Sequence, residues 1–279
     1  MTVLAPRQAL HRRSFAVGQG TLAVGLGIVA AWLLVALFAT FLAPYDPNAV
    51  DILHLLEAPS LAHPFGTDQA GRDVLSRTIH ASRIDLFMCM MGVVPPLLIG
   101  AAIGLVSGYL GGFADAILMR IYDVTVAFPF FVLVLAIVGV LGPGLENFFI
   151  ALALVGWVTY ARLVRAEVLV IKTSEYALAA RSLGFGPLTI MLRHVLPNAL
   201  SPVIVYAMTD AVLVILAGAS LGFLGMGAQP PVAEWGVMIA DGQIYVVRAW
   251  WICFFPGVAA ITLGIGLALT GDGLARLLR

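Results

Sequence analysis

Long apolar segments dominate this sequence and limit it to one kind of fold. A helix of about 20 apolar residues is long enough to cross the hydrocarbon core of a bilayer. Only 11% of the residues are charged, against about 25% in an average soluble domain. The sequence therefore predicts an all-α polytopic membrane protein, and it excludes a soluble enzyme, a disordered chain and a nucleic-acid binder. Six stretches qualify as transmembrane helices: 20–42, 86–110, 119–141, 147–168, 200–224 and 251–269.

The apolar run near the N-terminus predicts a retained first helix. It extends over residues 21–43, which is too long for the core of a signal peptide, and no A-x-A cleavage pattern follows. Pro95-Pro96 lies inside the second apolar stretch, where we expect a kink. The expected organisation has six parts: an N-terminal segment 1–19, a first helix 20–43, an outer segment 44–85, a five-helix core 86–279, an inner loop 169–199 and an outer loop 225–250.

The distribution of charge predicts the orientation of these helices. Loops on the cytoplasmic side of membrane proteins carry an excess of Lys and Arg. With the N-terminus inside, 11 of the 15 Lys and Arg residues fall on the cytoplasmic side, whereas nine of the 15 acidic residues fall outside. We therefore expect both termini in the cytoplasm. The formal net charge of zero is an average over two unlike surfaces.

No catalytic or metal site is predicted. Cys89 and Cys253 are far apart in apolar runs, and the five histidines show no metal-binding spacing. The chain has no P-loop, so ATP-driven work would need another protein. The segment 218–222 matches G-x-S-x-G, but it lies in an apolar helix with no strand before it, and no His or Lys lies at membrane depth. We expect small residues at a helix contact there.

Two further patterns suggest packing or transport roles. Gly100, Gly104, Gly108 and Gly112 recur every four residues, which gives one small-residue stripe for close helix packing. Asp210 lies within the fifth apolar stretch, and a carboxylate at that depth usually faces water or a partner. The functional interpretation is a group that lines a pathway, together with Ser220, or that relays protons, and the alternative is a charge pair.

Two other charged groups are better explained without substrate. Asp123 lies just inside the third apolar stretch, where a pair with Arg120 or with a partner subunit is the simpler interpretation. A set of alternating charges, Asp68, Arg72, Asp73 and Arg77, has i,i+4 spacing, which is typical of a charged helix face outside the membrane.

The inner loop 169–199 contains residues that typically begin and end short helices, and it predicts two of them. Thr173 or Ser174 can cap the first helix, and Glu175 lies in its first turn, where the helix dipole favours an anion. Gly184 suits the position just after a helix, which needs a positive φ, and Pro187 suits the first turn of a second helix.

The first of these helices has the properties of a docking element. It is about 10 residues or about 15 Å long, too short to be stable alone in water. Ala179 and Ala180 make part of its surface small, which suits insertion into a groove of another protein. Pro197 is expected to end the second helix before the fifth apolar stretch. An ordinary connecting loop is the alternative, although loops of this length usually carry function.

These residues resemble the EAA loop of ABC-importer permeases, in the form found in C-type subunits of the peptide/nickel branch. The resemblance rests on Ala179-Ala180-Arg181, Gly184 and the closing Arg193 to Asn198, RHVLPN. Leu178 stands where the Glu that names the loop would fall. The resemblance implies a coupling helix in a cleft of an ATPase subunit, formed by Glu175, Tyr176, Ala177, Ala179, Ala180, Arg181, Gly184, Phe185 and Gly186. It also implies a loop end formed by Arg193, His194, Leu196, Pro197 and Asn198.

Other blocks extend the resemblance over roughly residues 44–274. They are HPFGTD at 63–68, GYLGGFADAILMRIYD at 108–123, the Trp157 and Arg162 region, LGFLGMG at 221–227 with PP and EWG after it, and GDGL at 271–274. Members of this branch are transmembrane subunits that import peptides or nickel by alternating access. The resemblance implies peptide cargo, with nickel or another small solute as the alternative.

The resemblance also implies partners and a location. A homologous second permease, two ATP-binding subunits and a periplasmic or lipid-anchored substrate-binding protein are expected, in the lipid of the bacterial inner membrane. ATP and Mg would bind the partner ATPases, and no cofactor is expected on this chain. The outer loops around Trp235 would meet the binding protein. A gradient-driven transporter is the alternative from another class, but the sequence has no convincing repeat between its halves.

Overall fold

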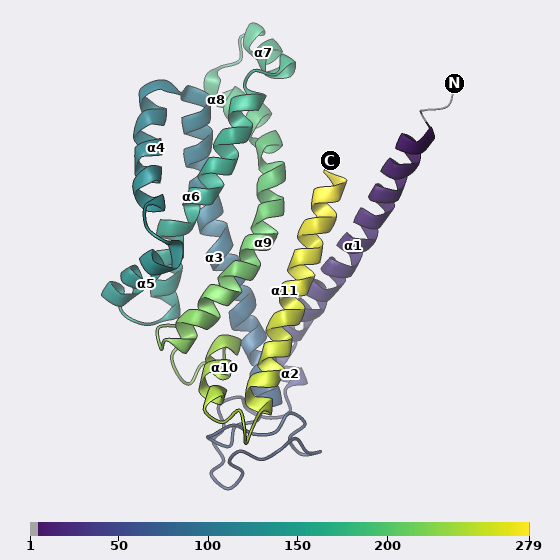
Figure 1. Cartoon of the computed structure of the whole chain (residues 1–279), viewed down its shortest axis with the longest axis vertical. Coiled ribbons are helices and arrows are strands. Elements are labelled where there is room, and N and C mark those ends of the chain that lie inside the picture. Colours follow the sequence, from purple (N-terminus) through teal and green to yellow (C-terminus); the bar gives the residue numbers. More distant parts are fainter. Residues whose placement is uncertain (1–4, 279) are drawn as a thin grey trace.

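The computed structural model describes residues 5–278, with side chains from residue 18 onward, and its regular structure is helical (Figure 1). The prediction of an all-α polytopic membrane protein is confirmed. In chain order the helices are α1 (Ala5–Leu37), α2 (Ala39–Leu42), α3 (Val74–Leu110), α4 (Gly112–Val126), α5 (Phe130–Leu141), α6 (Leu145–Ile171), α7 (Glu175–Ser182), α8 (Pro187–Thr189), the π-helix η1 (Ile190–Val195), α9 (Leu196–Phe223), α10 (Trp235–Gln243) and α11 (Trp251–Leu277).

Whether the structure has the six expected spans depends on how one pair of bent helices, α4 and α5, is counted. In the described part of the chain, five helices are long and apolar enough to cross a membrane, and six do so if α4 and α5 count together as one span. Pro95-Pro96 lies inside α3, which continues through both prolines. The first helix starts at Ala5 rather than at residue 20, so most of the expected N-terminal segment is helical.

The third expected span, 119–141, is not one straight helix. Its two halves, α4 and α5, are bent by 85° at a break that contains Phe128-Pro129. A proline disfavours helical backbone at the residue before it and has no N–H to donate, so the break falls where the chemistry permits it. At 12 residues α5 is only about 18 Å long, too short to cross the bilayer alone.

Glycines let α3 and α6 pack backbone to backbone. A Cβ at Gly100 would lie 2.4 Å from the Trp157 carbonyl oxygen, and one at Gly104 would lie 2.4 Å from the Ala161 oxygen. A Cβ at Gly108 would lie 2.9 Å from the Val168 side chain of α6. Three of the four glycines in the stripe therefore lie in this close helix contact. Gly112 does not belong to it, because it starts α4 with a φ of +56° and has open space around it.

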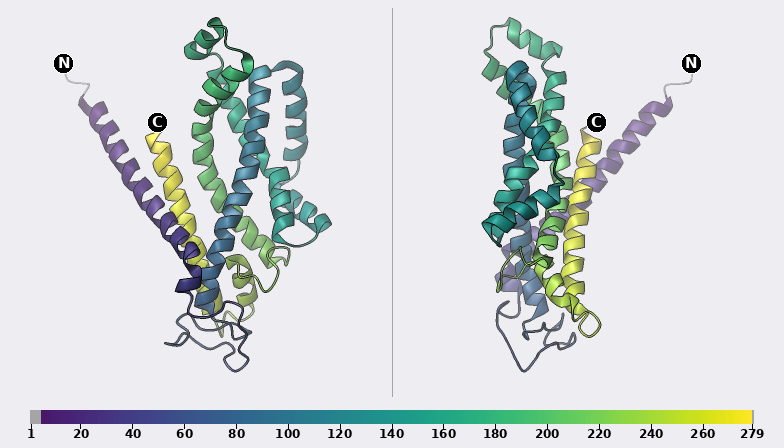
Figure 2. Two further views of the ribbon diagram at one scale, coloured as in Figure 1. Left: turned by 180° about the vertical axis from the view of Figure 1, so that it is seen from behind. Right: turned by 60° about the vertical axis from the view of Figure 1, so that its left-hand side comes forward.

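Two other long helices, α1 and α11, form a second pair beside this core. α1 runs along α11, and the two lie on the opposite side of the molecule from α4 and α5 (Figure 1). Figure 2 shows the same separation from behind. Gly25 and Gly273 allow close approach, because a Cβ at either would meet backbone atoms of the other helix at 2.5 Å.

The two ends of the bundle differ in character. α7, the start of α1 and the end of α11 lie at one end, here called the α7 end (Figures 1 and 2). The segment 43–73 and α10 lie at the other, here called the α10 end. This arrangement places the two loops of interest, 169–199 and 225–250, on opposite sides of the membrane-spanning part.

Candidate functional sites

The loop at the α7 end forms the short helix that its sequence predicts. α7 has eight residues, Glu175–Ser182. Gly184 follows with a φ of +83°, and the Phe185 N–H donates to the Ala180 carbonyl oxygen at 3.2 Å, which closes the helix end. The expected start differs in one detail, because the Ser174 hydroxyl donates to the Ile171 oxygen and does not cap α7.

The outward face of α7 is apolar rather than small. Ala177 and Ala180 are buried within the chain, so Ala180 does not contribute to the outer surface as expected. Tyr176 and Leu178 are exposed, as are Ala179 and Arg181. Together with the next turn, at Leu183 and Phe185, they present a row of apolar groups that nothing in the described chain covers.

The second half of the loop does not end where the sequence predicts. Pro187 does open α8, but Pro197 lies in the first turn of α9, and the helix runs on through it. The π-helix η1 ends just before α9, and a proline is tolerated in the first turn of a helix because an N–H there has no intrahelical partner. Arg193 is exposed, and the Asn198 amide donates to the His194 carbonyl oxygen at 2.8 Å. α8, η1 and α9 follow one another without a gap from Pro187 to Phe223, and the turn 183–186 separates them from α7.

A cavity of about 710 Å³ lies between α4, α5, α6 and α9. Its wall is mainly apolar and includes Phe128, Phe131 and Leu213. Asp210 and Ser220 both line it, so the structure brings together the two residues expected along a pathway. The Ser220 hydroxyl donates to the Leu216 oxygen of its own helix at 2.7 Å, which is a packing role and not that of an activated nucleophile.

Asp210 lies beside two tyrosines that the sequence analysis missed, and one of them forms a hydrogen bond to it. The Tyr160 hydroxyl of α6 donates to Asp210 Oδ2 at 2.7 Å. Tyr206, one turn earlier on α9, lies within hydrogen-bonding reach of the same carboxyl. The i,i+4 spacing of Tyr206 and Asp210 was readable as a pair on one helix face. Tyr160 is 50 residues away in sequence, and only the fold shows it.

The other intramembrane acid, Asp123, is exposed on α4 and forms no ion pair with Arg120 among the described residues. The neighbouring acid Asp115 is the paired one. Arg165 of α6 donates to both of its carboxylate oxygens at 2.7 Å. This pair fastens the start of α4 to α6.

At the α10 end, the expected charged helix face is a buried network. α3 begins only at Val74, so Asp68 and Arg72 lie in a turn and not on a helix. Asp68, Asp73 and Arg77 are each 3% exposed. The i,i+4 pair Asp68–Arg72 does form, at 2.7 Å, but Asp68 also faces Arg77 at 3.6 Å. Burial of these charges is possible because each has a partner.

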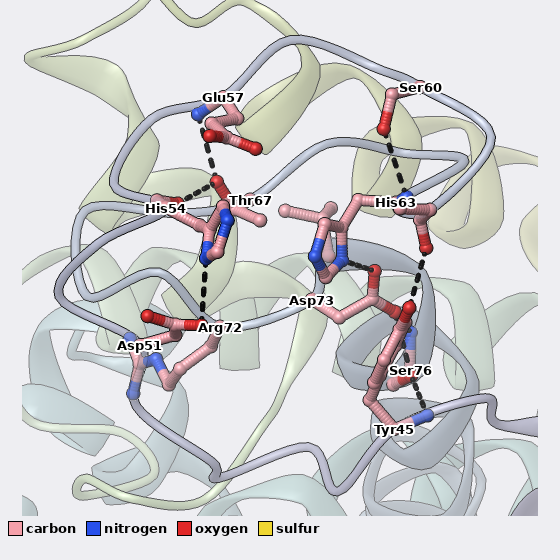
Figure 3. A network of polar contacts seen from close by, with 12 residues as sticks. Tyr45, Asp51, His54, Glu57, Ser60, His63, Thr67, Arg72, Asp73 and Ser76 are labelled. Atoms are coloured by element: carbon pink, nitrogen blue, oxygen red, sulfur yellow. Dashed lines mark hydrogen bonds and ion pairs between the residues drawn. The ribbon is translucent and has the colours of Figure 1, made fainter.

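Figure 3 shows how this network fixes the segment above the membrane. Asp73 caps α3 by accepting from the Ser76 N–H at 2.7 Å, and its other oxygen lies 2.9 Å from His63 Nδ1. The Thr67 hydroxyl donates to the His54 carbonyl oxygen and accepts from the Glu57 N–H. The segment 43–73 is therefore a folded unit and not a flexible linker.

A pair of buried carboxyls joins α10 to α3. The Glu234 side chain caps α10 by accepting from the N–H groups of Gly236 and Val237 at 2.7 and 2.8 Å. It meets the carboxyl of Asp85, whose Oδ2 accepts from the Trp235 N–H at 3.2 Å. Burial raises the pKa of Glu234 above its ordinary value. Two buried carboxyls in contact repel each other unless they share a proton.

Trp235 is fully buried and cannot contact a partner. Its indole N–H donates to the Thr78 oxygen at 3.0 Å, which anchors α10 to α3. The exposed residues of the loop 225–250 include 229–232 and the turn after α10, where Ile244 and Val247 are 80% and 98% exposed.

The helices, the cavity and the protruding loop define a multi-pass inner-membrane transport protein. Residues 100–279 match the family model described as "Binding-protein-dependent transport system inner membrane component", and the chain belongs to that family. The family covers more than half of the chain, including the loop 169–199 and the cavity helix α9.

Curated relatives agree with the resemblance to the peptide branch. The chain is 43% identical over 251 residues to a probable D,D-dipeptide transport system permease of Escherichia coli, covering 90% of this chain and 84% of the relative. It is 41% identical over 268 residues to a di/tripeptide transport system permease of Pseudomonas aeruginosa, covering 94% and 88%. It is 40% identical over 254 residues to a glutathione transport system permease of Pectobacterium atrosepticum, covering 90% and 84%.

Proposed function

We propose that this chain imports peptides as one of two membrane-spanning subunits of an ABC importer, and that its α7 loop receives the work of ATP hydrolysis by partner ATPases. The curated relatives are named as permeases for dipeptides, di/tripeptides and glutathione, which supports a short peptide as cargo rather than nickel. Family membership supports the import permease over a gradient-driven transporter. ATP and Mg would then bind the partner subunits, and no step of hydrolysis is assigned to this chain.

The distribution of basic residues supports one orientation of the protein in the membrane. With the α7 end in the cytoplasm, 11 of the 15 Lys and Arg residues lie inside. The α10 end and the segment 43–73 would then face the periplasm, where a substrate-binding protein delivers its load. Of that surface, the turn at Ile244 and Val247 offers the most exposed apolar groups of the loop 225–250.

The exposed apolar row on α7 is the observation that carries this proposal. Tyr176, Leu178, Leu183 and Phe185 are each at least 45% exposed at the tip of a short helix outside the membrane-spanning helices. Apolar groups concentrated at one exposed site favour a protein partner. α7 connects through α8 and η1 to α9, which lines the cavity. A displacement of α7 that carries the turn 183–186 with it would move the rod formed by α8, η1 and α9, which reaches the wall of the cavity. This is a physical route by which ATPase closure could bias two arrangements of the bundle.

Leu178→Asp tests the coupling role. The purified complex should lose its ATPase subunits, because a charge would be buried in the contact, and transport should fall with it. Leu61→Asp is the matched control, since Leu61 is 103% exposed at the α10 end, and it should leave the ATPase bound. Normal retention of the ATPase and normal cargo-stimulated hydrolysis in Leu178→Asp would refute the docking role of α7.

A further inference from the structure

Asp210 is the one ionisable acid that lines the cavity, and its position is central. It lies 14 residues after the start of α9 at Leu196 and 13 before its end at Phe223, which is the middle of this membrane-spanning helix. The rest of the lining has no other charged side chain. An ionisable group at that depth is costly and is expected to serve a pathway or a partner.

The carboxyl has donors but no cation. The Tyr160 hydroxyl donates to Oδ2 at 2.7 Å, and Tyr206 lies within hydrogen-bonding reach. Within residues 18–278, no Lys, Arg or His forms an ion pair with Asp210. The Tyr160 hydroxyl orients the carboxylate, which has about four lone-pair positions. Lone-pair positions therefore remain for a donor that the described part of the chain does not supply.

The size and wall of the cavity indicate what that donor is. A volume of about 710 Å³ lies within the range of small-ligand sites, which are mostly apolar with a few convergent polar groups. Phe128, Phe131 and Leu213 supply apolar and aromatic surface beside the single carboxyl. An ammonium group with apolar side chains attached satisfies both parts of this wall, because it donates to the carboxylate while its body packs against the rings.

We propose that Asp210 is the subsite for the ammonium group of a cationic amine, such as the free N-terminus of a peptide, as it passes through the cavity. The inference rests on the proposed function for its cargo class. Tyr160 and Tyr206 are positioning residues that hold the carboxylate toward the cavity. The alternatives are a carboxyl that stays neutral, or one that is turned away as a structural hydrogen-bond acceptor.

A charged thiol reagent tests the site without relying on transport. Leu213 lines the cavity within one turn of Asp210 and is 52% exposed. In the full transporter complex, with Cys89 and Cys253 replaced by Ala, Leu213→Cys is labelled with a cationic trimethylammonium-ethyl or an anionic sulfonatoethyl methanethiosulfonate. We expect Asp210→Asn to lower the ratio of the cationic to the anionic rate by about tenfold, equivalent to about 1.4 kcal/mol.

An unchanged ratio in Asp210→Asn would overturn the proposal, because the carboxyl would then be neutral or turned away. Leu216→Cys, also on the cavity wall and 58% exposed, provides a second position. If neither cysteine reacts with either reagent in any nucleotide state, the cavity is closed to cations and the proposal also fails. Asp123→Asn is the matched control, since it removes the same charge from α4 outside the lining, and the ratio should not change.

Transport separates this inference from the proposed function. With saturating peptide-loaded binding protein, Asp210→Asn should lower the maximal uptake rate at least tenfold, Asp210→Glu should restore part of it, and ATPase stimulation should persist. If uptake by the unmodified complex is absent, the peptide cargo is wrong, but the labelling ratio still decides the cation subsite. Full uptake by Asp210→Asn would exclude the ammonium subsite even with peptide transport intact.

Discussion

Replacing Asp85 by Asn is expected to stabilise this protein and to weaken its response to pH. Asp85 is 1% exposed, and its Oδ1 has no hydrogen-bond partner among the described residues. The carboxyl also meets Glu234, whose own oxygens already accept from Gly236 and Val237. An amide at position 85 can keep the bond from the Trp235 N–H and donate its NH₂ group to Glu234 without any shared proton.

The size of the stability change follows from two sources: the unpaired Oδ1 of Asp85 and the proton that the Asp85–Glu234 pair binds. A buried polar atom without a partner costs about 1–3 kcal/mol. Burial raises the pKa of Glu234, so the folded pair binds a proton that the unfolded chain releases above a pH of about 4.5. A raised pKa gives stability that is complete below the unfolded value and is lost as the pH rises. The loss is about 1.4 kcal/mol per pH unit while the folded pair retains its proton.

Thermal unfolding of the purified complex between pH 6 and pH 8 measures both effects. A free-energy change of 1 kcal/mol moves the midpoint of a domain of this size by about 2–4 °C. We expect the advantage of Asp85→Asn over the wild type to grow as the pH rises from 6 to 8, by about 1.4 kcal/mol per pH unit for as long as the folded pair keeps its proton. Asp85→Ala is the control, since it leaves the Trp235 N–H unpaired and should melt below both.

Two results would refute this reasoning. Asp85→Asn could melt as low as Asp85→Ala at every pH, which would mean that the ionised carboxyl itself stabilises the junction of α3 and α10. Alternatively, the difference between the wild type and Asp85→Asn could stay constant from pH 6 to pH 8. No proton would then be held by the pair.

Two further predictions concern packing. Gly104→Val should lower stability by at least about 1–3 kcal/mol, because its Cβ would lie 2.4 Å from the Ala161 oxygen, whereas Gly139→Val, in open space on α5, should change the melting midpoint much less. Trp251→Phe should cost about 1–3 kcal/mol by leaving the Thr67 carbonyl oxygen unpaired, and limited proteolysis should then cut the segment 43–73 faster. Equal melting of the two glycine variants, or unchanged proteolysis of Trp251→Phe, would contradict these expectations.

The apolar pattern predicted the long helices because bilayer thickness imposes their length. The spans assigned to 86–110, 147–168, 200–224 and 251–269 each lie within, or within one residue of, a single observed helix. The third span failed because α4 and α5 are both apolar, so composition does not distinguish a straight helix from two bent ones. Phe128-Pro129 was the local signal for the break, but the span was assigned from the length of the apolar stretch alone.

The polar sites were less predictable, because their partners are remote in sequence. Asp210 was identified from its depth alone, but Tyr160 is 50 residues away. The set around Asp68 was read as a helix face from its spacing, whereas burial and Arg77 decide its structure. Spacing rules apply to one element, and these sites are assembled from several.

The bond between Trp251 and Thr67 also has a consequence in time. The two residues are 184 positions apart, and the indole N–H meets the Thr67 carbonyl oxygen at 3.0 Å. At about 5–20 residues per second, the ribosome would add the last helix roughly 10 to 40 s after the segment 43–73 has been made. During synthesis that segment must wait, exposed and incomplete, for α11 to arrive. The segment 43–73 can therefore form its bond to Trp251 only after α11, the last helix, has been made.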